Sequence, residues 1–266
     1  MSSARLPKFD NPPVVEVALS ISFEPLEGYR SAHAGILWTH LRDQFPLTED
    51  QPELRAAIEE AGAPAPPPRF EVMERPRVRT WLQSLDGTQL LQVQHNRVAY
   101  NWKRGEGSQP YPSYDTVERR FRELWPVLIE VFEHEGLGRI VPNQAEVTYV
   151  NHIHEPHDRI SNVVTLCRSE GRAFLPPVED VRFGARYMIA DDTRQMIGRL
   201  IVDLQPAYVT STRAEILNLN MTARGKPRSP DIEGAFAFLG LGHEWIVQGF
   251  AELTTPEMHG KWKRRQ

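Results

Sequence analysis

The chain has 266 residues, a formal net charge of -4 and one cysteine, Cys167. One cysteine excludes a disulfide framework within the chain and a multi-cysteine zinc site, and the lack of net basic charge argues against general nucleic-acid binding. Because no apolar run approaches the ~20 residues of a membrane helix, and the N-terminus lacks the apolar run of a signal peptide, we expect a cytoplasmic protein without a membrane segment.

The first elements along the chain are a strand and a helix. Val14 to Phe23 alternates apolar and polar residues, which predicts a half-buried strand. Tyr29 to Phe45 carries apolar residues at helical spacing and stops before Pro46, so it predicts an amphipathic helix. From Leu47 to Arg69 we expect a short helical piece at residues 53 to 61, followed by a proline-rich surface spacer.

A strand meander and a long helix complete the first half of the sequence. Asp86-Gly87 between two alternating segments is typical of a hairpin turn. We expect three antiparallel strands at residues 78 to 85, 88 to 95 and 98 to 103, and 70 to 73 is a candidate for a further strand. Ser113 or Asp115 begins a helix that runs to about Glu135, and Pro126 should kink it or split it in two.

The second half repeats this order of elements. A strand is expected at residues 145 to 153, a polar irregular segment at 155 to 180, three strands at 183 to 190, 196 to 204 and 216 to 223, and a closing helix at 231 to 253. Placing Phe132 opposite Phe250 also places Phe121 opposite Leu239, so the apolar stripes of the two long helices match in phase.

These patterns predict an α+β fold of antiparallel sheets covered by long helices. We expect a strand–meander–helix unit to be duplicated about a pseudo-twofold axis. The two lobes would comprise residues 1–138 and 139–266, packed as one body. After the closing helix, Thr254 or Thr255 should cap a short helix that starts with Pro256 and brings Trp262 back to the body as a structural contact.

Short motifs along nearly the whole chain resemble a bacterial protein family of about this length with a sporadic distribution. The motifs are Pro12-Pro13-Val14-Val15-Glu16-Val17, Phe23-Glu24-Pro25-Leu26, Asn101-Trp102, Tyr111-Pro112 with Tyr114, Phe121 to Trp125, Glu146 with Tyr149 and Asn151, His243-Glu244, Phe250, Leu253-Thr254-Thr255-Pro256 and Trp262. The resemblance implies no activity, cofactor or catalytic residue. Sporadic distribution is typical of mobile accessory genes, including defence and toxin–antitoxin modules.

Two groups of histidines are candidates for a chemical role. His152 and His154 are two residues apart, so a strand would place both on one face, with His157 close behind. Such imidazole pairs bind zinc or iron, but histidines at a strand end are also often only solvated, and we expect no metal here. On the closing helix, His243 and Glu244 are candidates for acid–base chemistry. Because His243 falls near the apolar stripe of this helix, we favour a histidine that belongs to the core or to an interface.

Aromatic residues on the predicted meander offer a further hypothesis. Trp81, Tyr100 and Trp102 lie among cations, an arrangement with which single-strand nucleic-acid binders stack bases. Aromatic side chains buried under a helix explain the same pattern, and we favour this second interpretation.

Two functional hypotheses follow from the sequence. The first is a non-catalytic binding or regulatory module that recognises a partner protein, in a bacterial accessory, defence or toxin–antitoxin-type locus. The alternative is an enzyme or small-ligand-binding protein that uses a cleft between the lobes, with His152, His154, Glu146 or His243 as its polar groups. No cofactor is expected in either case.

Overall fold

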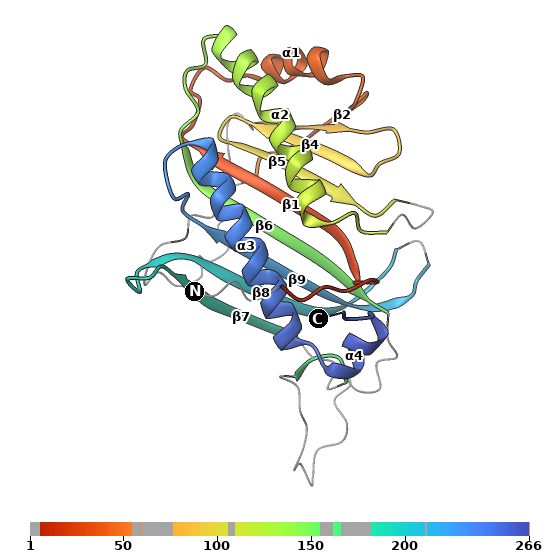
Figure 1. Ribbon diagram of the computed structural model, residues 1–266. Helices are drawn as coiled ribbons and strands as arrows, with labels where there is room; N and C mark the ends of the chain where they lie inside the picture. The colour runs from red at the N-terminus through yellow and green to blue at the C-terminus, as the bar shows by residue number, and fades with distance from the viewer. Residues whose placement is uncertain are drawn as a thin grey trace.

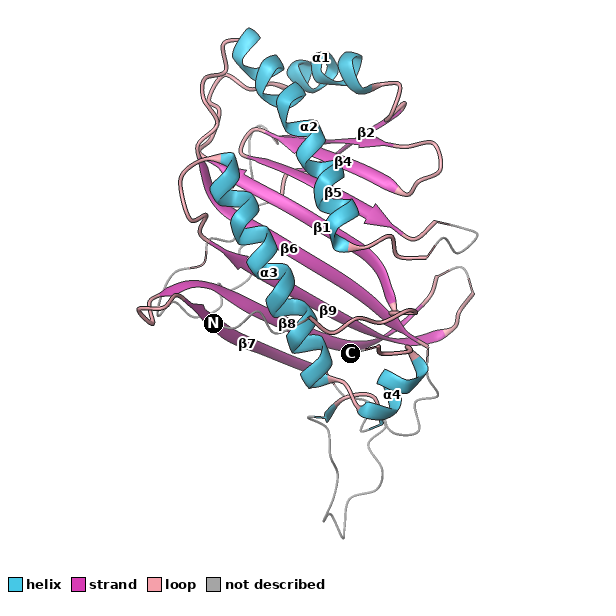
Figure 2. Ribbon diagram, viewed as in Figure 1, coloured by secondary structure: helices cyan, strands magenta, loops and turns pink. Residues whose placement is uncertain are grey.

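A computed structural model describes residues 6–54, 59, 77–105, 110–154, 162–165, 182–210 and 212–265. Over these residues the protein is α+β, with an antiparallel sheet of nine strands and four helices (Figures 1 and 2). The elements are, in chain order, β1 (Val14–Phe23), α1 (Ser31–Leu41), β2 (Leu47–Pro52), β3 (Val78–Gln83), β4 (Gln89–Gln94), β5 (Arg97–Lys103), α2 (Tyr114–His134), β6 (Pro142–Ile153), β7 (Phe183–Ala190), β8 (Met196–Tyr208), β9 (Glu215–Gly225), α3 (Ile232–Leu253) and α4 (Pro256–Lys261).

The strand order in the sheet is β2-β3-β4-β5-β1-β6-β9-β8-β7. Its central pair, β1 and β6, comes from the two halves of the sequence, and Leu19 of β1 lies opposite Val147 of β6. Every neighbouring pair is antiparallel. One sheet therefore continues across the boundary at residue 138 that the sequence suggested between two lobes.

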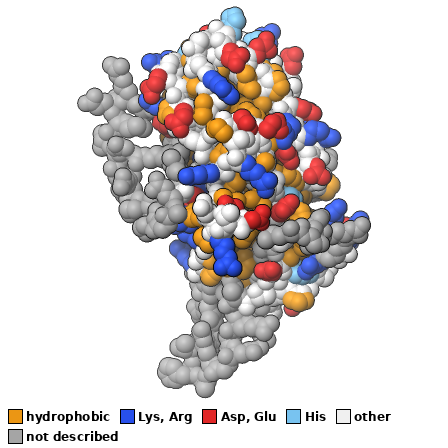
Figure 3. Space-filling model, turned by 60° about the vertical axis from the view of Figure 1, so that its left-hand side comes forward, with side chains coloured by type: hydrophobic (Ala, Val, Ile, Leu, Met, Phe, Trp, Pro, Cys, Tyr) orange, Lys and Arg blue, Asp and Glu red, His pale blue; other side chains and the backbone are white. Residues whose placement is uncertain are grey.

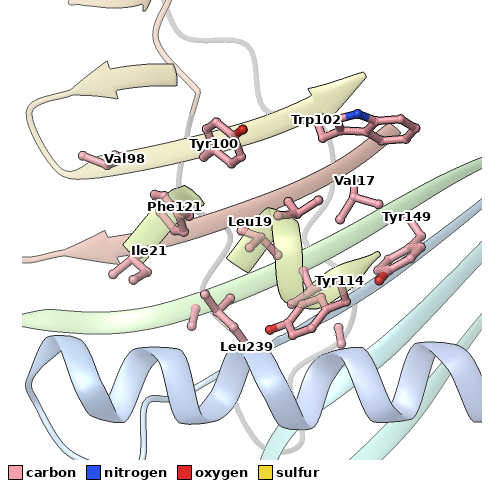
Figure 4. Packing of buried hydrophobic residues seen from close by; sticks show 14 of the residues in the cluster. Val17, Leu19, Ile21, Val98, Tyr100, Trp102, Tyr114, Phe121, Tyr149 and Leu239 are labelled. Atoms are coloured by element: carbon pink, nitrogen blue, oxygen red, sulfur yellow. The ribbon is translucent and has the colours of Figure 1, made fainter. Parts of the chain in front are cut away.

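The alternation of the strands gives the sheet one apolar face. Leu19 on β1 and Val147 on β6 are fully buried, and α2 and α3 lie across this face in Figure 1. Figure 4 shows Leu19, Phe121 and Leu239 in one cluster, so β1, α2 and α3 all contribute to it. We call this side of the sheet the helix face.

The two long helices also contact each other directly. The ring of Phe121 on α2 lies 5.6 Å from the ring of Phe236 on α3. Arg122 places its guanidinium 3.9 Å from the centre of the Phe236 ring and donates to Glu233 at 2.7 Å. Apolar burial and a cation–π contact therefore join α2 to α3 above the sheet.

Most predicted elements are present, and the differences have physical causes. Ser113 caps α2 through Thr116 N, and Pro126 lies inside one uninterrupted helix, so the helix is not split there. Strand β2 was not predicted, because its sequence LTEDQP is almost entirely exposed and therefore lacks apolar alternation. Of the helix expected at residues 53 to 61, residues 53 and 54 are not helical. The rest of it, except Glu59, and the candidate strand at 70 to 73 lie outside the described residues.

The closing segment packs against the body as the sequence predicted. Thr255 caps α4 by accepting from Met258 N, and Pro256 occupies the first helical turn. Trp262 is only 7% exposed, and its ring lies 5.1 Å from that of Phe250. Phe9 packs against the same rings, so residues near both ends of the chain meet here.

The surface in Figure 3 mixes side chains of both charge signs with hydrophobic ones. Lys and Arg do not gather into a separate basic region on this face, in keeping with the net charge of -4. Among the helices described, none combines the length and the apolar character needed to cross a bilayer.

Candidate functional site

The side of the sheet opposite α2 and α3 carries polar residues. On β6, Glu146 and Thr148 point to this side, because Val147 between them faces the helices. The partner strand β9 supplies Thr222, whose hydroxyl lies 2.9 Å from that of Thr148. We call this side the polar face. Its central residues are Ser20, Arg97, Asn101, Gln144, Glu146, Arg199 and Arg224.

An ion cluster on the polar face joins side chains from five strands, β5, β6, β9, β8 and β7. We call it the arginine cluster, and it consists of Arg97, Glu146, Arg224, Glu59, Arg199 and Arg186. Glu146 lies at its centre: one carboxylate oxygen accepts from Arg97 Nη2 at 2.8 Å, and the other accepts from Arg224 Nε. Arg97 Nε also donates to Ser20 Oγ at 2.6 Å, which ties its guanidinium to the neighbouring strand β1.

The second carboxylate of the cluster, Glu59, comes from the connection between β2 and β3. Its Oε2 accepts from Arg186 Nη2 at 2.6 Å and from Arg199 Nη1, and its Oε1 lies 3.4 Å from Arg224 Nη1. Its backbone N–H donates to Gln144 Oε1 at 3.1 Å. The Glu59 side chain is 5% exposed, so three guanidinium groups enclose a buried carboxylate.

The register of the sheet explains why this cluster needs carboxylates. Arg199 on β8 lies directly opposite Arg224 on β9, and like charges in such a position destabilise a sheet. Glu59 contacts both arginines and compensates their repulsion. Burial would raise the pKa of Glu146, but the charges of Arg97 and Arg224 outweigh it and hold the pKa below its ordinary value. The cluster is thus built to hold anionic oxygens.

A second polar network on the same face centres on Gln92. Its Oε1 accepts from Trp81 Nε1 at 3.1 Å and from Arg79 Nη1 at 2.8 Å, and its Nε2 donates to Asn101 Oδ1 at 2.6 Å. The Arg79 guanidinium and the Lys103 ammonium lie 5.3 and 5.4 Å from the centre of the Trp81 ring. We call Trp81, Arg79 and Lys103 the tryptophan patch.

The three aromatic residues of the meander separate onto the two faces. Tyr100 and Trp102 are buried on the helix face, where Tyr100 stacks on Phe121 at 6.2 Å. Trp81 is half-buried on the polar face. Burial under a helix therefore describes Tyr100 and Trp102, whereas Trp81 has two cations beside its ring.

His243 belongs to a network of tyrosines on the helix face. Its Nδ1 lies 2.9 Å from the hydroxyl of Tyr149, which lies 2.9 Å from the hydroxyl of Tyr111. The ring of Tyr114 stacks on the His243 ring at 4.0 Å. Burial lowers the pKa of His243 to about 4 against the smaller opposing effect of Asp115, so the imidazole is neutral at pH 7. Glu244, next to it in the sequence, is exposed.

This burial makes stability depend on pH. In the unfolded chain His243 takes up a proton near pH 6.5, whereas in the folded protein its pKa is about 4. The contribution of the neutral His243 to the free energy of unfolding is complete above pH 6.5 and is lost as the pH falls towards 4. When the pH falls from 7 to 5, the free energy of unfolding should decrease in both proteins. We expect this decrease to be about 1–2 kcal/mol smaller in His243→Asn than in the unmodified protein. Urea unfolding at both pH values checks this, and equal losses in the two proteins would contradict it.

The other histidines of the sequence hypothesis lie elsewhere. His152 is on the polar face near the end of β6, where burial and the charge of His154 lower its pKa. His154 follows the strand, and His157 lies outside the described residues. Within the described ranges no group of three His, Cys, Asp or Glu side chains is placed to hold a metal ion.

The structure therefore separates the polar groups that the enzyme hypothesis combined. Glu146 and His152 share the polar face, but His243 lies on the helix face, with the sheet between them. Glu146 is joined by arginines, not by a histidine. Sequence reasoning did not single out Glu59, Arg186, Arg199 or Arg224. The signal available was the presence of arginines on the polar side of three predicted strands.

Comparison with known proteins adds no assignment, since no protein-family model, curated protein or solved structure matches this chain. The function is therefore inferred from the residues themselves.

Proposed function

We propose that this protein is a non-catalytic binding module that recognises a partner protein through the polar face of its sheet. The main support for this proposal is the arginine cluster. Its guanidinium groups come from strands of the sheet, whereas one of its two carboxylates, Glu59, comes from outside the sheet. Arginine pairs with carboxylates through several directed hydrogen bonds, which gives protein recognition its specificity. The tryptophan patch adds the combination of Trp and Arg that dominates the energetics of protein interfaces.

A regulatory role is consistent with this binding chemistry. We also propose a cytoplasmic location, and the resemblance to a sporadically distributed bacterial family supports a function in an accessory, defence or toxin–antitoxin-type locus. The partner would then be the product of a neighbouring gene.

We also propose that residues 1–138 and 139–266 are duplicated lobes of one body. Read outwards from the centre, the strand order is β1-β5-β4-β3 in one half and β6-β9-β8-β7 in the other. In each half a long helix follows the strand next to the central one, α2 after β5 and α3 after β9. A crystal structure in which these strands of the two halves cannot be superposed would contradict the proposal.

The alternative, an enzyme or small-ligand-binding protein, draws on the neutral His243 in its tyrosine network. A neutral imidazole bonded to a tyrosine hydroxyl can accept or donate a proton. A small molecule whose binding is lost in His243→Asn but retained when the tryptophan patch is changed would favour this alternative.

The binding proposal is tested by affinity purification from the native host with quantitative mass spectrometry. The bait is the full chain, compared with Arg79→Ala/Lys103→Ala, which removes both cations beside Trp81. Arg120→Ala is the matched control, because its guanidinium is half exposed on α2 and pairs only with neighbouring Glu123 among the contacts described. We expect one protein partner to be retained with the control and reduced about tenfold, or ~1.4 kcal/mol, with the double variant. Equal recovery with all three baits would overturn the proposal.

A further inference from the structure

We infer that Arg186, Arg199 and Arg224 form a carboxylate-binding site for an acidic side chain of the partner, and that Glu59 occupies this site within the free chain. This inference rests on the proposed function, because it names the chemistry of the partner at the same face. It assigns to Glu59 the role of an internal competitor.

The site is built by the sheet, independently of its occupant. Arg186, Arg199 and Arg224 come from three adjacent strands, β7, β8 and β9. Arg224 is also held by Glu146 through its Nε, which leaves Nη1 directed to the occupant. The ladder thus positions the backbone of all three arginines, and Glu146 holds the Arg224 side chain, before any further carboxylate is bound.

Glu59, in contrast, is remote in sequence from the residues that bind it. It is separated from Arg186 by 127 positions, from Arg199 by 140 and from Arg224 by 165. It is not part of a strand, whereas Glu146 sits inside β6 directly opposite Arg224. Of the two carboxylates in the cluster, only Glu59 can be exchanged without breaking the sheet.

The contacts also indicate the class of ligand. Two guanidinium groups donate to one oxygen of Glu59 and a third reaches the other oxygen, which is the pattern for a planar acceptor with two oxygens. An aspartate or glutamate of a partner matches this shape and this charge. Because Arg199 and Arg224 face each other across the strands, the site favours an occupied state, and one carboxylate replaces another with no change in net charge.

The inference is tested with a fluorescent hexaglutamate peptide and the purified full chain by fluorescence anisotropy. We expect Glu59→Ala to bind the peptide about tenfold more tightly than the unmodified protein, because the internal competitor is removed. Adding Arg186→Ala to this variant should abolish the gain. Glu233→Ala is the matched control, since it removes an exposed carboxylate that binds Arg122 on the helix side, and it should leave the peptide affinity unchanged.

A thermal melt of each variant shows whether it is folded. If Glu59→Ala does not fold, Arg186→Ala in the otherwise unmodified protein replaces it, and weaker peptide binding is then the expected result. Unchanged affinity in every folded variant would overturn the inference. So would binding of inorganic phosphate or of a fluorescent oligonucleotide by a protein that does not bind the peptide, because the ligand class would then be wrong. Neither outcome affects the affinity-purification result at the tryptophan patch, so failure of the inference is distinguishable from failure of the proposed function.

Discussion

Replacement of Glu146 by alanine is expected to lower the free energy of unfolding by about 3 kcal/mol or more, because it removes one partner of a buried ion network. The Glu146 side chain is 14% exposed and bridges Arg97 to Arg224. Without it, two guanidinium groups remain in the interior of the polar face with one carboxylate fewer between them. For a chain of this size the melting temperature should fall by roughly 6–12 °C, which differential scanning fluorimetry and urea unfolding can measure.

Glu123→Ala provides the matched control for this loss. Glu123 pairs with Arg120 on the surface of α2, and both side chains are about half exposed. Exposed ion pairs of this kind contribute about 0–1 kcal/mol, so this variant should melt close to the unmodified protein. Adding Arg97→Ala to Glu146→Ala should recover part of the stability. If both single glutamate variants melted alike, the cluster would be no more than a surface ion pair.

The second large effect is expected where α3 crosses the sheet. A Cβ on Gly198 of β8 would lie 2.6 Å from the carbonyl oxygen of Arg224 and 2.8 Å from the Phe238 ring. The backbone oxygen is fixed in the β8–β9 ladder, and Phe238 is 1% exposed. Neither can retreat, so Gly198→Ala should cost about 3 kcal/mol or prevent folding. Chemical denaturation of the soluble fraction measures the cost.

Gly240→Ala should have the opposite sign. Gly240 lies within α3, and a Cβ there would meet no atom within 4 Å. Alanine favours a helix over glycine by up to about 1 kcal/mol, so the variant should be slightly more stable. A loss of stability in Gly240→Ala, or none in Gly198→Ala, would show that the spacing of α3 from the sheet differs from that described.

The strands could be predicted where burial imposes an alternation on the sequence. Val14–Phe23 is such a case, because Leu19 and Ile21 are fully buried in the core while Ser20 between them contacts Arg97 on the polar face. Strand β2 could not be found in this way, since neither of its faces is buried. The C-terminal end of β8 was also underestimated: the strand continues through Pro206 to Tyr208, beyond the apolar pattern.

The candidate site was less accessible to prediction than the fold. The sequence drew attention to Glu146 and His243 as polar groups, but periodicity gives only the face of a residue and not its neighbours in space. The cluster depends on β6, β9 and β8 lying side by side in a register that sets Glu146 opposite Arg224, and Arg224 opposite Arg199. Glu59 lies within the short helical piece expected at residues 53 to 61, and that expectation does not connect it to these arginines.

The central pairing of β1 with β6 has a consequence for biosynthesis. Strand β1 is complete at residue 23. It pairs with β5 along one edge and with β6 along the other, and β6 ends only at residue 153. At 5–20 residues per second, a ribosome needs on the order of 10 s to cover that interval. Throughout it, the nascent chain carries an apolar strand with an open edge, the kind of edge that pairs with other chains. A ribosome that stalls within the helix after Ser113 would therefore release a fragment prone to aggregation, and a chaperone would have to shield β1 until β6 emerges.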